Sequence, residues 1–459
     1  MTKSTAVEKF LKGLFSSLNS GNTRYAVMRN YDSLPYTTGE SDLDILLHPG
    51  DEKKARAAIE EAIGLADAVL LGYACKRDFF TFSVLCCNYD DHNSWDGLLV
   101  DFFVEWRYLS AAHLVDTNLL NSRYSVLKDI RVLPKNLSAV TAILKNLLHQ
   151  NTVPLKYKAK LAAKTLADWE MMWKDLSPIG RPAFNLLFEI CSMNSDFTDL
   201  SHKSKCLRKL VLYEAYSRSP LAYFWDRCMH VAFIFSRFFK PPGLCIAVLG
   251  TDGVGKSTLI SAISPVLFSA THGNFTIKHL RPGLLPPLSR VFKISKKKIN
   301  TTNNPHGSEP SGAIGSLLRL LYLCADYILG YWLIIRPKIS KSPGIIIMDR
   351  YAYDMEFDQR RFRIALPSKV VSFFMNIVPR PDIIFCLSGD PDEIASRKNE
   401  LPKNEVERQI YILEKFAKKN PRALLINTEG NVERSANSVF EGLSKMCSAR
   451  AKLLCKSEA

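Results

Sequence analysis

One run of residues in this chain has a spacing with a definite chemical meaning. It reads Gly250-Thr251-Asp252-Gly253-Val254-Gly255-Lys256-Ser257-Thr258, between an apolar stretch at 246–249 and a helix-like stretch at 259–263. In such a GxxxxGKS loop, the glycines let backbone N–H groups surround an anion at the N-terminus of a helix. The lysine reaches the β- and γ-phosphates, and the serine hydroxyl holds Mg²⁺. The sequence therefore predicts an ATP-binding loop in which Lys256 contacts phosphate and Ser257 ligates magnesium.

Length and composition limit the class of protein. With 459 residues the chain is too long for a single core, so we expect two or three domains. Its formal net charge of +16 favours anionic partners such as nucleotides, phosphorylated substrates or an acidic membrane surface, although a generally basic surface explains it equally well. We find no nucleic-acid-binding motif and predict no nucleic-acid partner. The 11 cysteines are scattered without a CxxC pair, which argues against zinc and disulfides and for a reducing, cytoplasmic location.

The chain reads as three regions. Residues 1–135 alternate strand-like and helix-like patterns, and residues 136–240 have apolar positions at helical spacing. From 241 to 459, strands alternate with helices in the manner of a parallel sheet. The strands expected in this last region are 245–249, 345–348, 383–387 and 423–426. We therefore predict an N-terminal α+β domain, a helical middle domain and a C-terminal α/β domain in which helices flank a parallel P-loop sheet.

Two apolar stretches bear on membrane contact. The stretch at 314–335 is interrupted by Arg319 and Asp326, and charges inside a spanning helix are costly, so we predict a buried helix of the α/β domain. The shorter run at 231–235 is flanked by arginines; it is too short to span a bilayer but could lie on one. The sequence thus predicts no transmembrane helix and leaves peripheral membrane contact and a homodimer open.

Further motifs follow the loop in a fixed order. They are Arg281-Pro282-Gly283, Asp349-Arg350-Tyr351 at the end of an expected strand, the apolar strand that begins with Pro381-Asp382, and Arg397-Lys398. Together with residues 250–258, this order resembles thymidylate kinase over roughly residues 243–446. The resemblance implies a P-loop kinase that uses ATP and Mg²⁺ to phosphorylate a nucleoside monophosphate such as dTMP.

Phosphoryl transfer needs positioning and charge neutralisation more than covalent chemistry, and the motifs supply suitable groups. The expected catalytic residues are Lys256, Asp349, Arg350 and Arg397, with Asp349 joining Ser257 near the metal. Arg350 can clamp a phosphate through two parallel hydrogen bonds. Arg397, with Lys398, would close over the donor phosphates. A buried ion pair is the alternative for Asp349 and Arg350, and a solvated helix charge is the alternative for Arg397.

The resemblance also implies an acceptor site. Its expected members are Asp252, Arg281, Arg350 and Asp354, with Asp252 facing the sugar hydroxyl of the acceptor and Arg281 on its phosphate. This side departs from the thymidylate kinase pattern, because Tyr327 replaces an arginine that follows Ala-Asp in the long helix of that family. Arg360, Arg361 and Arg363 could replace the lost positive charge. The acceptor stays open between dTMP, another nucleotide, and a phosphorylated or hydroxylated sugar.

Three acidic residues near the N-terminus could hold metal ions. Asp42 and Asp44 alternate at the start of an apolar strand, so both side chains lie on one face, and Asp101 lies on a later strand. Three carboxylates on adjacent strands can form a two-metal site. The pattern resembles the nucleotidyltransferase superfamily over roughly residues 23–110, although its Gly-Ser turn is replaced by Met28-Arg29-Asn30-Tyr31. A domain that only binds substrate, with Asp42 and Asp44 as solvated turn charges, is the alternative.

Three classes of function are compatible with these features. The first is an ATP-dependent small-molecule kinase, and the second is a nucleotidyltransferase acting through the three aspartates. The third is a non-catalytic ATP-binding regulatory protein. Thymidylate-kinase-like proteins whose motifs are similar to residues 349–354 and 397–401 tend to be linked with surface-polysaccharide synthesis, which widens the choice of acceptor. A basic stretch at 293–312 reads as a disordered loop or as a lid that captures phosphate.

Overall fold

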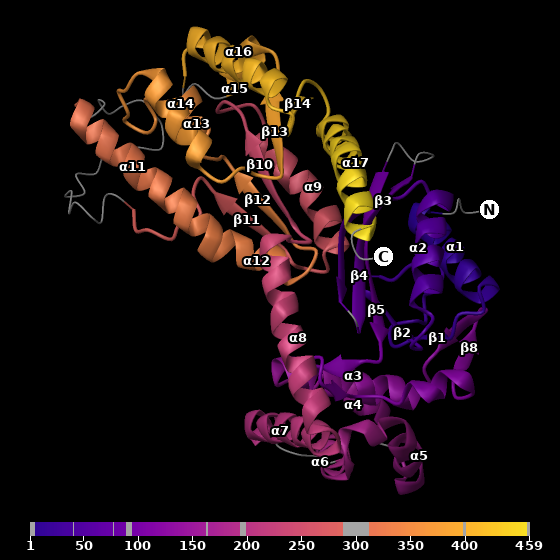
Figure 1. The fold of residues 1–459 in the computed structure, drawn as a ribbon. Helices are drawn as coiled ribbons and strands as arrows, with labels where there is room; N and C mark the ends of the chain where they lie inside the picture. The colour runs from indigo at the N-terminus through magenta and orange to yellow at the C-terminus, as the bar shows by residue number, and fades with distance from the viewer. Residues whose placement is uncertain are drawn as a thin grey trace. The chain divides into compact units, whose positions relative to one another are not determined.

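The computed structural model describes residues 5–39, 41–76, 78–88, 94–161, 164–192, 199–287, 312–397 and 401–456 (Figure 1). The chain divides into two compact units. The first holds most of the chain up to Ser236, and the second holds Arg237–Ala459 together with Leu70–Gly72 and Asn93–Gly97. The basic stretch at 293–312 lies outside the described residues, apart from Gly312.

The first unit begins with a seven-stranded mixed sheet in the order β3-β4-β5-β2-β1-β9-β8. Its strands are β1 (Tyr25–Val27), β2 (Leu43–Leu47), β3 (Val69–Lys76), β4 (Phe79–Asn88), β5 (Ser94–Val104), β8 (Ser125–Leu127) and β9 (Ile130–Val132). The unit also contains helices α1 (Ala6–Ser20) and α2 (Glu52–Leu65) and a two-stranded ribbon of β6 (Arg107–Tyr108) and β7 (Ala112–His113). β2 is buried along its whole length and pairs in parallel with β5, so that Asp44 lies opposite Asp101. Strand pairing therefore brings two of the predicted carboxylates together.

The region predicted to be helical is helical in the described residues. Its helices are α3 (Lys135–Gln150), α4 (Leu155–Leu161), α5 (Leu166–Leu176), α6 (Arg181–Ser192), α7 (Leu200–Arg218) and α8 (Pro220–Phe239). α3 buries a broad apolar stripe that includes Leu144 and Leu147, and Trp169 of α5 and Leu207 of α7 belong to the same core cluster. That cluster also contains Ala26 and Leu46 of the sheet, so the helices and the sheet of this unit share one core.

The second unit contains a five-stranded sheet in the order β11-β12-β10-β13-β14, and every pairing in it is parallel. The strands are β10 (Leu244–Leu249), β11 (Phe275–His279), β12 (Ile345–Asp349), β13 (Ile383–Ser388) and β14 (Ala423–Asn427). The four strands expected from the sequence are confirmed to within one residue at each end. β10 is buried throughout, as a strand covered on both faces should be. The mixed α/β class with a parallel sheet is confirmed for this unit.

Helices cover both faces of this sheet (Figure 1). They are α9 (Lys256–Ala270), α11 (Ala313–Gly330), a π-helical turn (Tyr331–Ile335), α12 (Arg336–Lys341), α13 (Asp354–Phe357), α14 (Ser368–Ile377), α15 (Pro391–Arg397), α16 (Lys403–Lys419) and α17 (Val432–Lys456). Cys245, Ala247 and Leu249 of β10 share a core with α11 to α14 and α16. Because side chains alternate along a strand, the residues between them face the other side, where α9 and α17 pack against each other. The carboxyl ends of the strands are left open for a ligand.

The stretch predicted to be a buried helix is helical, but only part of it is buried. Ala313–Lys341 is, among the described residues, the one helix long and apolar enough to cross a membrane, and 44% of its most apolar window is buried. Leu320 and Tyr327 face the core, whereas Ile314 and Leu318 are exposed. A core helix of an α/β fold meets the same length and composition criteria.

Candidate functional site

The 250–258 loop leaves the carboxyl end of β10 and leads directly into α9. Gly253 and Gly255 have φ values of +88° and +95°, which side-chain-bearing residues rarely adopt. At Gly250 an added Cβ would lie 2.8 Å from Cγ1 of Val254, so only glycine fits there without a shift. The first N–H groups of a helix have no intrahelical partner, and those of α9 are directed toward this loop. The backbone is therefore suited to receiving an anion.

Lys256, the first residue of α9, is buried against the loop. Its Nζ donates hydrogen bonds to the carbonyl oxygens of Gly250 at 2.8 Å and Thr251 at 2.6 Å, and lies 3.9 Å from the Asp252 carboxylate. Burial lowers the pKa of Lys256 to about 7, and the positive charge of Arg350 acts in the same direction. An anion placed in the loop would oppose both effects and favour the ammonium form.

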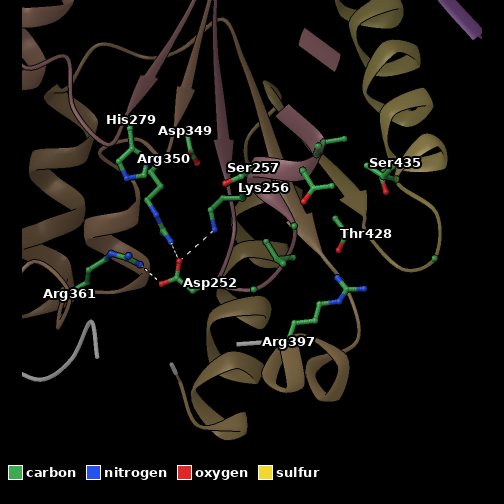
Figure 2. Close-up of a pocket in the computed structure, with 17 residues that line it drawn as sticks. Asp252, Lys256, Ser257, His279, Asp349, Arg350, Arg361, Arg397, Thr428 and Ser435 are labelled. Atoms are coloured by element: carbon green, nitrogen blue, oxygen red, sulfur yellow. Dashed lines mark hydrogen bonds and ion pairs between the residues drawn. The ribbon is translucent and has the colours of Figure 1, made fainter. Parts of the chain in front are cut away.

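A cavity of about 650 Å³ opens beside this loop (Figure 2). Of the predicted site residues it is lined by Asp252, Gly253, Val254, Gly255, Lys256, Ser257, Thr258, Asp349, Arg350 and Arg397. Arg361 lines the cavity as well, so the guanidinium groups of Arg350, Arg361 and Arg397 all reach it. Arg397 ends α15 and pairs with Glu393 at 2.7 Å, and its side chain is 38% exposed. Lys398 lies outside the described residues.

Asp252 is held by cations from two other segments. Its carboxylate accepts hydrogen bonds from Nη2 of Arg350 and from Nη1 of Arg361. Burial by itself would raise the pKa of Asp252, but the positive charges of Arg350, Lys256 and Arg361 outweigh it and lower the pKa to about 2. Asp252 is therefore ionised at neutral pH and can only accept hydrogen bonds.

Asp349 lies at the end of β12, beside the loop. Its Oδ2 pairs with Nδ1 of His279 at 2.9 Å, while Oδ1 is buried and has no hydrogen-bond partner within the described parts of the chain. Ser257 lines the same cavity. A buried carboxylate oxygen with a free lone pair and a hydroxyl that lines the same cavity are oxygen ligands of the kind that Mg²⁺ prefers. These two residues therefore fit the predicted metal.

Two predicted acceptor residues do not line this cavity. Arg281 forms an ion pair with Asp326 of α11, at 3.3 Å, and Asp326 is fully buried. Asp354 is buried 3.8 Å from Nη1 of Arg350; burial raises the pKa of Asp354 in spite of that neighbour. Asp354 is thus placed to orient Arg350 from one side while Asp252 accepts from it. Contact of Arg281 with an acceptor stays a prediction.

In the first unit, Asp42, Asp44 and Asp101 converge. Their carboxylate oxygens all lie within 4.8 Å of one another, and Oδ1 of Asp101 is buried without a hydrogen-bond partner among the described residues. Two basic side chains of the protein contact the same carboxylates. Arg29 bonds Asp42 at 2.8 Å and also bonds Asp44, and Lys145 lies 3.2 Å from Asp44. The aspartates are therefore not solvated turn charges, as the alternative interpretation had them.

The pKa values of Asp44 and Asp101 shift in opposite directions. Burial would raise the pKa of Asp44, but Lys145 and Arg29 outweigh it and lower that pKa. Burial raises the pKa of Asp101 to about 7, and the negative charge of Asp44 adds to the effect. The donor set suits a divalent cation in its oxygen atoms. However, two positive side chains already neutralise Asp42 and Asp44, so a metal would have to displace them or bind beside them.

Comparison with known proteins finds a likeness among solved structures. No protein-family profile and no curated protein matches the chain. Among solved structures, it is similar to a thymidylate kinase from Ehrlichia chaffeensis, with 21% identity and a TM-score of 0.31. The match covers 44% of this chain and 100% of that one. At this TM-score the likeness carries no argument about function.

Several residues that line the cavity were not assigned to it from the sequence. They are Leu259, His279, Arg361, Thr428, Gly430, Val432 and Ser435, of which Arg361 was considered only as replacement charge. Thr428 and Gly430 follow β14, and His279 ends β11. Because ligands of open parallel sheets bind at the carboxyl ends of the strands, the strand predicted at 423–426 could have pointed to Thr428. No signal distinguished Arg361 from the neighbouring Arg360 and Arg363.

Proposed function

We propose that residues 241–459 form an ATP- and Mg²⁺-dependent phosphotransferase that transfers the γ-phosphate to a small anionic acceptor. The acceptor is a nucleoside monophosphate, such as dTMP, or a related phosphorylated or sugar compound. One observation carries the proposal: a single cavity is lined by Lys256, Ser257, Asp349 and the guanidinium groups of Arg350, Arg361 and Arg397. Phosphoryl transfer requires this kind of concentrated positive charge around transferring oxygens.

The donor side consists of the 250–258 loop and Arg397. The loop's N–H groups and Lys256 would hold the β- and γ-phosphates, and Arg397 would neutralise charge from the opposite wall of the cavity. Ser257 and Asp349 would hold Mg²⁺ directly or through its water shell; when bound, the ion supplies charge neutralisation between the phosphates. His279, paired with Asp349, orients that carboxylate.

On the acceptor side we place Arg350 and Arg361, with Asp252 between them. The two guanidinium groups would hold an acceptor phosphate by charge-assisted hydrogen bonds. Asp252, ionised at neutral pH, would accept a hydrogen bond from a hydroxyl of the acceptor. Lys256, 3.9 Å from Asp252, would lie between the donor and acceptor groups and stabilise the charge that develops during transfer.

The proposal is tested by measuring ADP release from Mg-ATP with the purified full chain. The acceptors should include dTMP, other nucleoside monophosphates, sugar phosphates and unphosphorylated sugars. Lys256→Ala should lower the rate with the active acceptor by about 10²- to 10³-fold, the cost of removing one group that stabilises transition-state charge. Lys369→Ala, which removes an exposed lysine of α14, is the control and should leave the rate unchanged.

Two other outcomes would redirect the interpretation. ATP binding by calorimetry without ADP release for any acceptor would favour the non-catalytic, regulatory alternative. Release of pyrophosphate that is lost in Asp44→Ala and kept in Lys256→Ala would favour nucleotidyl transfer by the first unit. The convergence of Asp42, Asp44 and Asp101 supports that second candidate, whereas Arg29 and Lys145 in the cluster oppose it.

A further inference from the structure

Helix α8 has its polar side chains on the side that faces the protein. Asp226 pairs with Arg107 at 3.0 Å, and Nδ1 of His230 lies 2.9 Å from the hydroxyl of Ser110. All four residues belong to the first unit. None of the helix's 20 residues is buried. In a soluble protein an amphipathic helix normally packs its apolar stripe on the core, so α8 is oriented the opposite way.

The outward face of α8 is consequently apolar and aromatic. The exposed large side chains on this face are Leu221 (86%), Phe224 (59%), Trp225 (64%), Met229 (52%), Phe235 (63%) and Phe239 (68%). These positions run along the whole helix, which at 1.5 Å per residue is about 30 Å long. A continuous apolar strip of this length is unfavourable in water and marks a surface that another apolar phase covers.

Within the second unit, the last residues of α8 contact the end of the long apolar helix. The ring of Phe238 packs on Trp332, with centroids 5.9 Å apart, and Arg336 donates hydrogen bonds to the carbonyl oxygens of Phe238, at 2.5 Å, and Phe239. Trp332 and Leu333 are themselves 41% and 63% exposed. The guanidinium of Arg336 thus fixes the C-terminal end of α8 beside further exposed apolar residues.

The charge near the apolar strip distinguishes between two partners that could cover it, a second copy of the chain and a lipid surface. Helix α7, directly before α8, carries five basic residues and one acidic residue: Lys203, Lys205, Arg208, Lys209 and Arg218 against Glu214. Lys203 and Arg218 pair with Glu189 and Glu214, which leaves the helix an excess of positive charge at Lys205, Arg208 and Lys209. The whole chain carries a formal charge of +16. A second copy would bring like charges together, whereas an anionic lipid surface would complement them.

We propose that α8 lies in the interfacial region of an anionic lipid bilayer, with Trp225 and Phe235 inserted and the basic residues of α7 near the headgroups. Trp and Phe on one face with basic residues nearby are typical of helices that lie in a membrane interface. Asp226 and His230 remain bound to the protein side, so α8 would lie along the surface and not cross it.

The experiment is flotation of the full-length protein with vesicles. We expect the protein to float with vesicles of phosphatidylcholine and phosphatidylglycerol, to float weakly with phosphatidylcholine alone, and to dissociate as salt screens the charges. Trp225→Glu with Phe235→Glu should lower the partition coefficient by at least about tenfold, because two aromatic side chains lose their burial in lipid. ATP turnover in solution should be unchanged in this variant.

The matched control is Leu65→Glu with Leu166→Glu, two residues of α2 and α5 that are 63% and 68% exposed. It makes the same change in charge and a similar loss of apolar surface, and should float like wild type. An equal loss of flotation in the control would overturn the proposal, as would failure of the wild type to bind anionic vesicles. A wild-type dimer that the Trp225→Glu/Phe235→Glu variant splits without lipid would assign the strip to a second copy instead.

Discussion

Arg361 donates a hydrogen bond to Asp252, a residue 109 positions earlier in the chain. The contact places a guanidinium from the turn after α13 on the wall of the cavity that the 250–258 loop lines. The predicted Arg281 pairs elsewhere, with Asp326. Among the arginines considered as replacement charge, Arg361 is the one that lines this cavity.

Arg361→Ala should therefore weaken acceptor binding specifically. Loss of a charge-assisted hydrogen bond, about 1.5–3 kcal/mol, predicts a rise in KM for the acceptor of about 10- to 100-fold. The Kd for ATP, measured by calorimetry, should stay within about twofold, since the donor groups are untouched. Arg360→Ala, which removes the neighbouring exposed arginine, is the control. If both variants raised KM equally, general charge and not this contact would be responsible.

Asp326→Ala should destabilise the second unit. Asp326 is fully buried, pairs with Arg281 and accepts a hydrogen bond from the N–H of Leu285 at 2.6 Å. Removing it strands a largely buried guanidinium, which typically costs about 3–5 kcal/mol of unfolding free energy. Urea denaturation followed by circular dichroism would measure this loss.

The double variant Arg281→Met/Asp326→Leu separates the charge from the packing. It removes both charges and should recover most of the lost stability, because buried pairs can often be replaced by apolar residues. If Arg281 contacts the acceptor as the sequence predicts, the double variant will be stable but will show a raised KM. Wild-type KM in a stable double variant would remove Arg281 from the acceptor site.

In the first unit, Arg29→Met with Lys145→Met should increase affinity for Mn²⁺. Both side chains now neutralise Asp42 and Asp44, so their removal leaves carboxylates that need another cation. We expect the Kd for Mn²⁺, measured by electron paramagnetic resonance, to fall by at least about tenfold, the equivalent of 1.4 kcal/mol.

A second basic pair serves as its control. Arg24 and Lys54 both pair with Asp51 in the same unit, at 2.8 and 3.3 Å. Arg24→Met with Lys54→Met removes the same charges away from the three aspartates and should leave Mn²⁺ affinity unchanged. Tight Mn²⁺ binding to the wild type, lost in Asp101→Asn, would contradict the view that the cluster is satisfied by the chain's own cations.

The low pKa of Asp252 predicts a pH-dependent contribution to stability. A carboxyl whose pKa falls from 3.8 to about 2 on folding contributes stability above its unfolded pKa and loses it as the pH falls through the folded pKa. The stability difference between wild type and Asp252→Asn should therefore contain about 2 kcal/mol that is present at pH 5 and declines below pH 4. Urea unfolding across this range measures it, and a difference that did not decline would show that Asp252 is not the titrating group.

The sequence predicted the second unit well for identifiable reasons. β10, β12 and β13 are short apolar runs buried on both faces, and Gly253 and Gly255 mark a backbone conformation that few other residues adopt. β11 gave a weaker signal, since most of its residues are only partly buried. The sequence marked Arg361 only as one of three candidate replacement charges, because its place in the cavity depends on a tertiary contact with Asp252 and not on a local pattern.

In the first unit, the sequence predicted the acidic residues of the cluster but not the basic residues that pair with them. Period-two spacing placed Asp42 and Asp44 on one strand face, and the parallel pairing of β2 with β5 then brought Asp101 beside them. The positions of Arg29 and Lys145 in the cluster had no local signature. In α8 the contacts of Asp226 with Arg107 and of His230 with Ser110 likewise had no local signature.

The turn that carries Arg361 is closed by its own hydrogen bonds. The N–H of Arg361 donates to Asp358 at 3.2 Å, and the N–H groups of Phe362 and Ile364 both donate to the carbonyl of Gln359. Phe362 and Ile364 anchor it in the core. A self-contained turn of this kind can diverge in sequence without disturbing the sheet. Under the proposed function, exchange of this short peptide would change the preference for the acceptor and leave the 250–258 loop as it is.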